Sequence, residues 1–225
     1  MANNTPQSPR PSGEPPALSR RQAVLAARCL LVLALLAVLR FAADLLNSEL
    51  LAALPISLPV REMRAAGDAA GAVALAAGGA VLLVLGQACG RYRAAGTCRL
   101  VCGIYAAAAL VFPALPEPLP LSLVTPIYFA ALAAGVYLEF TAHARVLAGT
   151  EDRLARWWRV LWWCTAGLAA LVLGALAMLS VSWAAVYLLL TIADWGLLAL
   201  DLACTATLYR TAGALRRAGA GQDSG

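Results

Sequence analysis

Six long apolar stretches run through this sequence, and they leave the chain few ways to fold in water. They lie near residues 24–46, 69–89, 99–115, 121–142, 160–181 and 184–208. A helix needs about 20 apolar residues to cross roughly 30 Å of hydrocarbon, and each stretch comes close to that length. Apolar residues make up 62% of the chain and charged residues 13%, far from the balance of a soluble domain. The sequence therefore predicts an all-α integral membrane protein, a bundle of six transmembrane helices.

The flanks of these stretches differ from them in composition. Residues 1–19 are rich in proline, serine and asparagine and cannot bury a core, so we expect a disordered N-terminal tail. Residues 20–210 would form the transmembrane domain, and residues 211–225 a flexible cytoplasmic tail. The first apolar run follows Arg20 and Arg21 but continues past Arg40 without a clear cleavage site. We therefore interpret it as an uncleaved first span rather than a signal peptide.

The arginines predict how the bundle is oriented, because short cytoplasmic segments retain positive charge. With both termini cytoplasmic, only Arg61 and Arg64 lie outside, and Arg28 and Arg40 lie within spans. All the other arginines then fall on the cytoplasmic side: Arg10, Arg20, Arg21, Arg91, Arg93, Arg99, Arg145, Arg153, Arg156, Arg159, Arg210, Arg216 and Arg217. This bias accounts for the net charge of +5 and gives no case for nucleic-acid binding. We expect a multi-pass protein of the cell membrane.

Several kinds of chemistry are excluded by residues that the chain lacks. It contains no lysine, which rules out a retinal or pyridoxal Schiff base. His143 is the only histidine, so a bis-histidine haem and an HExxH zinc site are excluded. The six cysteines include no CxxC pair, and we interpret them as packing residues. We predict no metal and no cofactor.

Two aspartates interrupt the last apolar stretch. Asp194 and Asp201 are seven residues apart, so they share one helix face, which Tyr187 and Thr205 extend. A central aspartate costs about 2.5 to 3.5 kcal/mol to insert, whereas a leucine or valine gains roughly 0.3 to 0.6 kcal/mol. The neighbouring leucines can therefore carry this helix into the membrane, but the aspartate face should not contact lipid.

Depth along each span identifies possible partners for these acids. At 1.5 Å per residue, Arg28, Gln87, Glu139 and Asp201 all lie roughly 25 to 27 Å from the outer end of their spans. On the same scale Arg40 lies at about 9 Å and Asp194 at about 15 Å, and Arg40 could pair with Asp194 or with Asp44 on its own helix. Our hypothesis is a polar pocket that opens toward the cytoplasm and is lined by Arg28, Arg40, Gln87, Glu139, Asp194 and Asp201. In the alternative, the residues near the interface snorkel or pair structurally, and only Asp194 is deep.

Two further patterns concern packing and the membrane surface. The second stretch carries Gly67, Gly71, Gly78, Gly79, Gly86 and Gly90, which favours close helix packing. The segment TEDRLARWWRVLWW, which begins at Thr150, combines tryptophans with arginines at the start of the fifth span. It indicates either an ordinary aromatic belt or a site for an anionic lipid or a partner.

Three functions fit the sequence. The first is a small transport or binding module that holds or passes a proton, an ion or a small solute. The second is a non-catalytic accessory membrane subunit whose buried charges bind its own helices or a partner, either another membrane protein or a second copy. The third is an intramembrane enzyme that acts on a lipid or prenyl substrate, with Asp194 as the acid among Trp163, Trp183, Tyr187 and Trp195. The sequence favours the first two over an enzyme.

Overall fold

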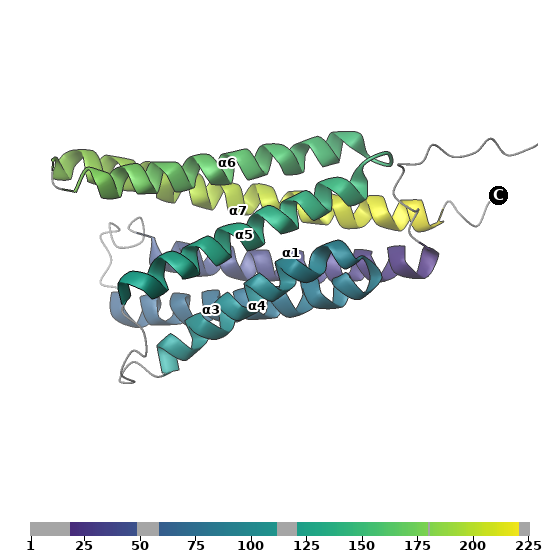
Figure 1. Cartoon of the computed structure of the whole chain (residues 1–225), viewed down its shortest axis with the longest axis horizontal. Helices are drawn as coiled ribbons and strands as arrows, with labels where there is room; N and C mark the ends of the chain where they lie inside the picture. Colours follow the sequence, from purple (N-terminus) through teal and green to yellow (C-terminus); the bar gives the residue numbers. More distant parts are fainter. Residues whose placement is uncertain (1–18, 49–58, 112–120, 180, 221–225) are drawn as a thin grey trace, which may run out of the picture.

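A computed structural model describes residues 19–48, 59–111, 121–179 and 181–220, and all regular structure in these ranges is helical (Figure 1). The helices are α1 (Arg20–Asn47), α3 (Val60–Ala88), the short 3-10 helix η1 (Gly90–Tyr92), α4 (Arg93–Val111), α5 (Leu121–Leu147), α6 (Asp152–Ala177) and α7 (Trp183–Ala220). Six helices in these ranges are long and apolar enough to cross a membrane. The predicted all-helical architecture with six long apolar helices is confirmed at this level.

The helices extend beyond the predicted spans at several ends, most clearly in α3 and α7. The helix α3 begins at Val60, about two turns before the predicted start of the second span. The helix α7 continues to Ala220, so residues 211–220, which we expected in a flexible tail, are helical. They stay helical because Thr211, Ala212 and Leu215 are buried against the bundle. The predicted N-terminal tail up to residue 18 and the last five residues lie outside the described part of the chain.

The start of α1 is fixed by a local motif. Ser19 accepts a hydrogen bond from the backbone N–H of Gln22, and the Gln22 side chain accepts one from the backbone N–H of Ser19. This capping box satisfies two N–H groups that the first turn leaves free. Gln22 also donates a hydrogen bond to the carbonyl of Ala88 at 3.3 Å, which ties the start of α1 to the end of α3.

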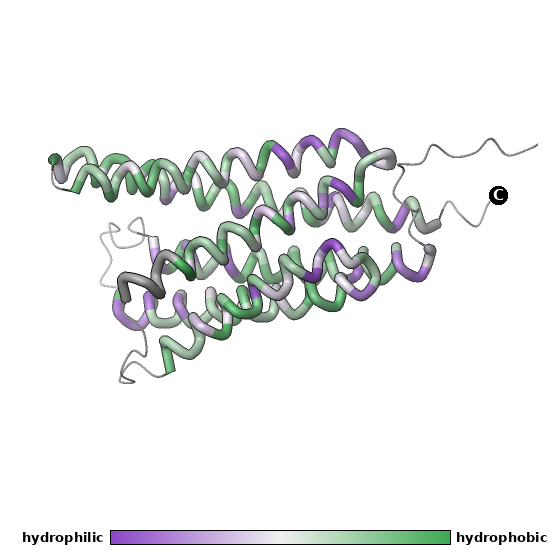
Figure 2. Tube along the Cα trace, in the orientation of Figure 1, coloured by the Kyte–Doolittle hydropathy of each residue, from purple (hydrophilic) through white to green (hydrophobic). Residues whose placement is uncertain are grey.

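The six long helices pack in a closed ring. Each helix lies against its neighbours in the order α1, α3, α4, α5, α6, α7, and α7 returns to α1. The buried core lies in the half of the ring where α1 begins and α7 ends, with Leu30, Leu82, Leu147, Trp158 and Leu215 among its members. Polar residues also concentrate at this end of the bundle (Figure 2). The apolar core therefore closes this end of the bundle.

Glycines bring α3 and α4 into backbone contact. A Cβ atom at Gly79 would overlap the backbone nitrogen of Leu100 and would lie 2.9 Å from the carbonyl oxygen of Gly96. A Cβ at Gly96 would lie 2.8 Å from the backbone nitrogen of Leu83, and one at Gly103 would overlap the backbone of Ala76. Both sides of this contact are backbone, which cannot move aside as a flexible side chain can. Small residues at such crossings are typical of helix packing in membranes.

The Gly79→Ala variant tests this close contact. The added methyl group must push α3 and α4 apart, and overpacking of this kind costs about 1 to 3 kcal/mol. We expect a clearly lower midpoint of thermal unfolding in detergent. Gly167→Ala on α6 is the control, because nothing lies within 4 Å of a Cβ there and alanine favours a helix. Equal midpoints for the two variants would contradict the close packing of α3 on α4.

Candidate functional site

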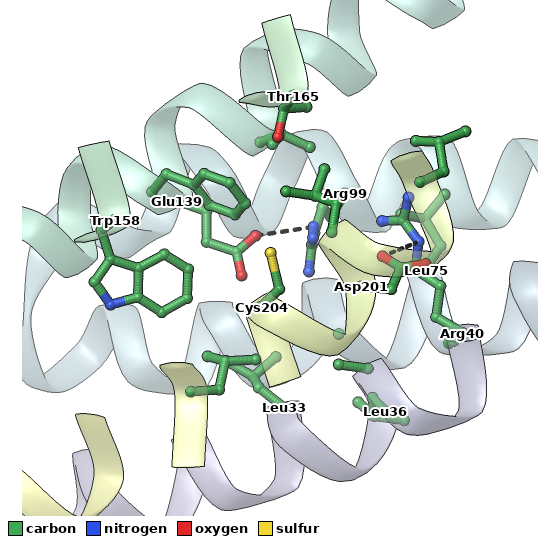
Figure 3. A pocket seen from close by; sticks show the side chains of 18 residues that line it. Leu33, Leu36, Arg40, Leu75, Arg99, Glu139, Trp158, Thr165, Asp201 and Cys204 are labelled. Atoms are coloured by element: carbon green, nitrogen blue, oxygen red, sulfur yellow. Dashed lines mark ion pairs between the residues drawn. The ribbon is translucent and has the colours of Figure 1, made fainter. Parts of the chain in front are cut away.

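Glu139 on α5 is the most deeply buried carboxylate in the described part of the chain, with 2% of its surface exposed. Its Oε2 lies 3.0 Å from Nε of Arg99 on α4 (Figure 3). The Arg99 side chain is itself only 15% exposed. An ion in such surroundings is stable only beside an opposite charge, so the pair holds α4 and α5 in register.

Two glycines leave room for the Arg99 side chain. A Cβ at Gly78 on α3 would lie 3.6 Å from Nη1 of Arg99, and one at Gly135 on α5 would lie 3.7 Å from its Cγ. A larger residue at either position would crowd the guanidinium or the stem. The small residues therefore allow a long charged side chain to extend between three helices.

His143, one helical turn beyond Glu139, continues the polar cluster toward the end of α5. Its Nε2 lies 3.6 Å from Oε1 of Glu139, and its Nδ1 lies 2.9 Å from the hydroxyl of Tyr92. The ring stacks on the indole of Trp158 with 4.3 Å between centroids. Trp158 in turn donates a hydrogen bond from Nε1 to Oγ1 of Thr211 at 3.1 Å. His143 and Trp158 have no exposed surface and Tyr92 only 2%, so these side chains close this end of the bundle.

Arg40 forms a second charged group, which lies nearer the end of the bundle where α1 ends. Its Nε lies 3.5 Å from Asp44 on the same helix and 3.9 Å from Asp201 on α7. The Asp201 side chain is 13% exposed, whereas Arg40 and Asp44 are about two-fifths exposed. The sequence left open whether Arg40 would pair with Asp44, and the structure confirms that it does.

A cavity of about 90 Å³ lies between the two charged groups (Figure 3). Residues from all six long helices line it, and its charged members are Arg40, Arg99, Glu139 and Asp201. We call this space the central cavity. It has room for a few water molecules, although not for a larger solute.

A second cavity of about 330 Å³ adjoins the central cavity at Arg40 and Leu75, which line both. Asp44, Asn47 and Asp68 also line it, which places it toward the end of the bundle where α1 ends and α3 begins. We call this space the outer cavity, because the arginine distribution predicts that this end faces outside. Polar surface thus extends from the outer end of the ring to its centre.

Three polar atoms of residues that line the central cavity are buried without a hydrogen bond from the described protein: Arg99 Nε, Glu139 Oε2 and Asp201 Oδ2. The N–H of Arg99 is not aimed at the carboxylate, although the ion pair is only 3.0 Å long. Buried polar groups almost always have a hydrogen-bond partner. These atoms therefore have the capacity to bind water or a small ligand in the central cavity.

The formal charges of the two groups do not cancel. Arg40 and Arg99 contribute two positive charges, while Asp44, Asp201 and Glu139 contribute three negative charges when ionised. The cluster thus carries one excess negative charge. Such a charge in a region of low dielectric constant attracts one proton or one monovalent cation.

Of the six predicted site residues, Arg40, Glu139 and Asp201 line one cavity. Arg28 and Gln87 are exposed on the outside of the bundle and do not join them. Asp194 is half-buried on α7 and is not among the residues that line the central cavity. The position of a residue along a span gives its depth but not the side of the helix on which it lies. Arg28 and Gln87 were therefore assigned the same depth as Glu139, although they lie on the outside of the bundle.

The sequence prediction missed the partners of Glu139. Arg99 was assigned to a cytoplasmic connection, but α4 begins at Arg93 and carries Arg99 into the bundle. The small residues Ala95 and Gly96 just before it were the available signal, since they allow a helix to start early and pack closely. We predicted an opening at the end of the bundle where α1 begins and α7 ends, which the arginines predict to be cytoplasmic, whereas Tyr92 and His143 are buried at that end.

No family model matches the chain, no characterised protein is detectably similar to its sequence, and no solved structure matches its fold. The six long apolar helices are compatible with a multi-pass membrane protein. Any more specific role depends on the chemistry of the cavities and their charged residues.

The Arg99–Glu139 pair can be tested by a double-mutant cycle. Removing one partner of a buried pair costs about 3 to 5 kcal/mol because the other charge is left alone. We expect Glu139→Gln and Arg99→Gln each to lower the unfolding free energy by that order, and the double variant to recover much of the loss.

A matched control uses the exposed pair of Arg217 and Glu151, which lies 3.4 Å apart with the Arg217 side chain 75% exposed. The variant Glu151→Gln should cost less than about 1 kcal/mol. Purely additive losses at Arg99 and Glu139 would mean that the two side chains do not interact.

Proposed function

We propose that the chain is a six-span protein of the cell membrane, with both termini on the cytoplasmic side. The length and hydropathy of the six helices support insertion. An even number of spans keeps both termini on one side, and most arginines gather at that end of the ring. The exposed apolar surface, which includes Leu35, Leu173 and Val181, would then face lipid rather than water.

This orientation is tested by fusing reporters to the complete chain. Green fluorescent protein attached at either terminus should fluoresce, because it folds in the cytoplasm. Alkaline phosphatase at the same positions should stay inactive, because it needs the oxidising outer side. The opposite result at both termini would reverse the orientation, and different results at the two termini would exclude an even number of spans.

We propose further that the chain is a small transport or binding module for a proton. The observation that carries this proposal is the group of charged residues around the central cavity, in which the acids outnumber the arginines by one when all are ionised. Ionisable residues inside a membrane domain mark ion and proton pathways in many transporters. The central cavity is too small for a larger solute, and Tyr92, His143 and Trp158 seal its inner end. A proton can cross such a seal along hydrogen bonds, whereas a hydrated ion cannot.

The residues suggest an order of steps. A proton from the outer cavity would reach Asp201 beside Arg40 and then cross the central cavity to Glu139. Glu139 would pass a proton to Nε2 of His143, which requires a small rotation to shorten the present 3.6 Å. The imidazole would release its other proton from Nδ1 to the hydroxyl oxygen of Tyr92, 2.9 Å away, while that hydroxyl gives its own proton to water at the inner end. The step from Asp201 to Glu139 would require water in the central cavity to carry the proton.

Proton uptake into proteoliposomes tests the proposal. A potassium diffusion potential drives the flux, and a pH-sensitive dye inside the vesicles records it. Asp201→Asn removes the carboxylate that pairs with Arg40 from α7 and lines the central cavity, and we expect it to lower the flux at least tenfold. Glu151→Gln, which changes an exposed carboxylate at the end of the bundle, should leave the flux unchanged. Folding of each variant is checked by its elution volume in size-exclusion chromatography and by its midpoint of thermal unfolding.

The absence of any proton flux in the folded wild type would overturn the transport proposal. A flux that is equal in the wild type and in Asp201→Asn would exclude the central cavity as its route. Adding a sodium gradient to the same vesicles, with the potassium diffusion potential unchanged, shows whether a cation other than the proton is carried.

A second candidate function is a non-catalytic accessory subunit. Its support is the pairing itself, because Arg99–Glu139 and Arg40–Asp201 each join two helices and could be purely structural. Such a protein would bind another membrane protein or a second copy through its exposed apolar faces. If the protein is an accessory subunit, Asp201→Asn would reduce its stability or its assembly, and the wild type would show no proton flux.

The intramembrane acid enzyme is the weaker alternative. Its proposed cavity around Asp194 required Trp163, Trp183, Tyr187 and Trp195 to surround the acid. These four side chains are 57% to 75% exposed on the outside of the bundle. They therefore do not enclose a pocket in which a prenyl lipid could be protonated.

A further inference from the structure

A pocket of about 470 Å³ lies on the outside of the bundle between α5 and α6, near the turn that joins them. We call it the α5–α6 pocket. Arg145 and Arg159 line the end nearer the turn, which we call its mouth, and Tyr137, Trp162 and Trp163 line the end further along the helices, which we call its deeper part. Its residues take no part in the two charged groups described above.

The mouth of the pocket is positively charged. Arg145 and Arg159 are both exposed, and neither forms an ion pair with the described residues. The acid at the mouth, Asp152, already accepts a hydrogen bond from the backbone N–H of Gly149 at 2.9 Å. The two guanidinium groups are therefore free to bind an anion. Guanidinium groups bind phosphate with two parallel hydrogen bonds.

The deeper part of the pocket is apolar and aromatic. Tyr137 lies eight residues before Arg145 on α5, which places it about 12 Å further into the bundle. Its ring meets Trp162 edge to face with 5.0 Å between centroids. Trp163 lies one turn beyond Arg159 and is 72% exposed. The pocket thus has a cationic mouth and an apolar floor along the helix direction.

We propose that the α5–α6 pocket binds an anionic phospholipid of the cytoplasmic leaflet. The phosphate would lie between Arg145 and Arg159, and an acyl chain would follow Tyr137, Trp162 and Trp163. This leaflet is the one that carries anionic lipids, and arginines near its surface each gain roughly 1 kcal/mol from them. The inference depends on membrane insertion and on the proposed orientation, and it is independent of the proton site.

Charge argues against a second copy of the chain as the occupant. Arg153 and Arg156 are also exposed on the first turns of α6, so two such mouths would repel each other. A soluble phosphate would leave the exposed Trp163 without a role. An amphiphile with a negative head satisfies both ends of the pocket.

The α5–α6 pocket shares a wall with the central cavity. Phe140 and Trp158 line both the α5–α6 pocket and the central cavity, so their rings form a shared wall. Their centroids lie 5.1 Å apart, and the indole of Trp158 stacks on His143. A lipid in the pocket would contact this wall at Phe140, which packs on Trp158, and would thereby keep the inner end of the cavity closed.

Native mass spectrometry of the purified full-length protein tests the proposal with phosphatidylglycerol and phosphatidylcholine as probes. We expect the wild type to retain one phosphatidylglycerol preferentially. The variant Arg145→Gln/Arg159→Gln should bind it at least tenfold more weakly. The matched control is Arg153→Gln/Arg156→Gln, which removes two exposed arginines of α6 that do not line the pocket and should change binding less than twofold.

Four results would overturn the proposal. Equal losses in both double variants would mean diffuse attraction to the charged surface. Equal retention of the two lipids would mean that the headgroup charge is not recognised. Displacement of the lipid by millimolar inorganic phosphate would indicate a site for a soluble anion. A dimer that dissociates only in Arg145→Gln/Arg159→Gln would show that the pocket holds a second copy.

Discussion

The burial of Glu139 is the constraint on which the centre of this bundle depends. A carboxylate with 2% of its surface exposed is stable only with a cation beside it, and Arg99 supplies that cation at 3.0 Å. Arg99 can reach it because Gly78 and Gly135 leave space around its side chain. The close approach of α3 and α4 places this arginine inside the ring. Packing of the backbone and pairing of the charges are therefore linked.

The second charged group is more exposed than the first, so the exposure of the charged residues decreases from the outer cavity toward Glu139. Arg40 and Asp44 are partly exposed and line the outer cavity, whereas Glu139 lies behind them in the packed half of the ring. The effective dielectric constant thus falls from the outer cavity toward Glu139, and interactions between charges grow stronger along the same direction. A proton that enters from outside would meet hydrated groups first and the tightly held pair last.

The helices could be predicted from the sequence, but the contacts between them could not. Hydropathy identified six helices, since a run of about 20 apolar residues has few other stable structures. The cost of inserting a charge into the membrane singled out Asp194 and Asp201, and depth along the spans added Glu139. Arg28 and Gln87 were wrongly grouped with them, as no single sequence specifies the rotation of each helix in the ring. The contact of His143 with Tyr92 joins residues 51 positions apart, and no local pattern indicates it.

Release of a proton from the buried Tyr92 would require water to reach the sealed inner end, and the packing indicates which helix can move. The helix α6 packs mainly on α5 and α7, its neighbours in the ring, and it carries Trp158, which covers His143. A shift of α6 would therefore uncover the histidine without breaking the Arg99–Glu139 pair, which joins α4 and α5. A lipid bound between α5 and α6 would favour the closed arrangement only as far as it binds that state more tightly. In such a protein the lipid composition of the membrane would set how often the inner end of the cavity opens.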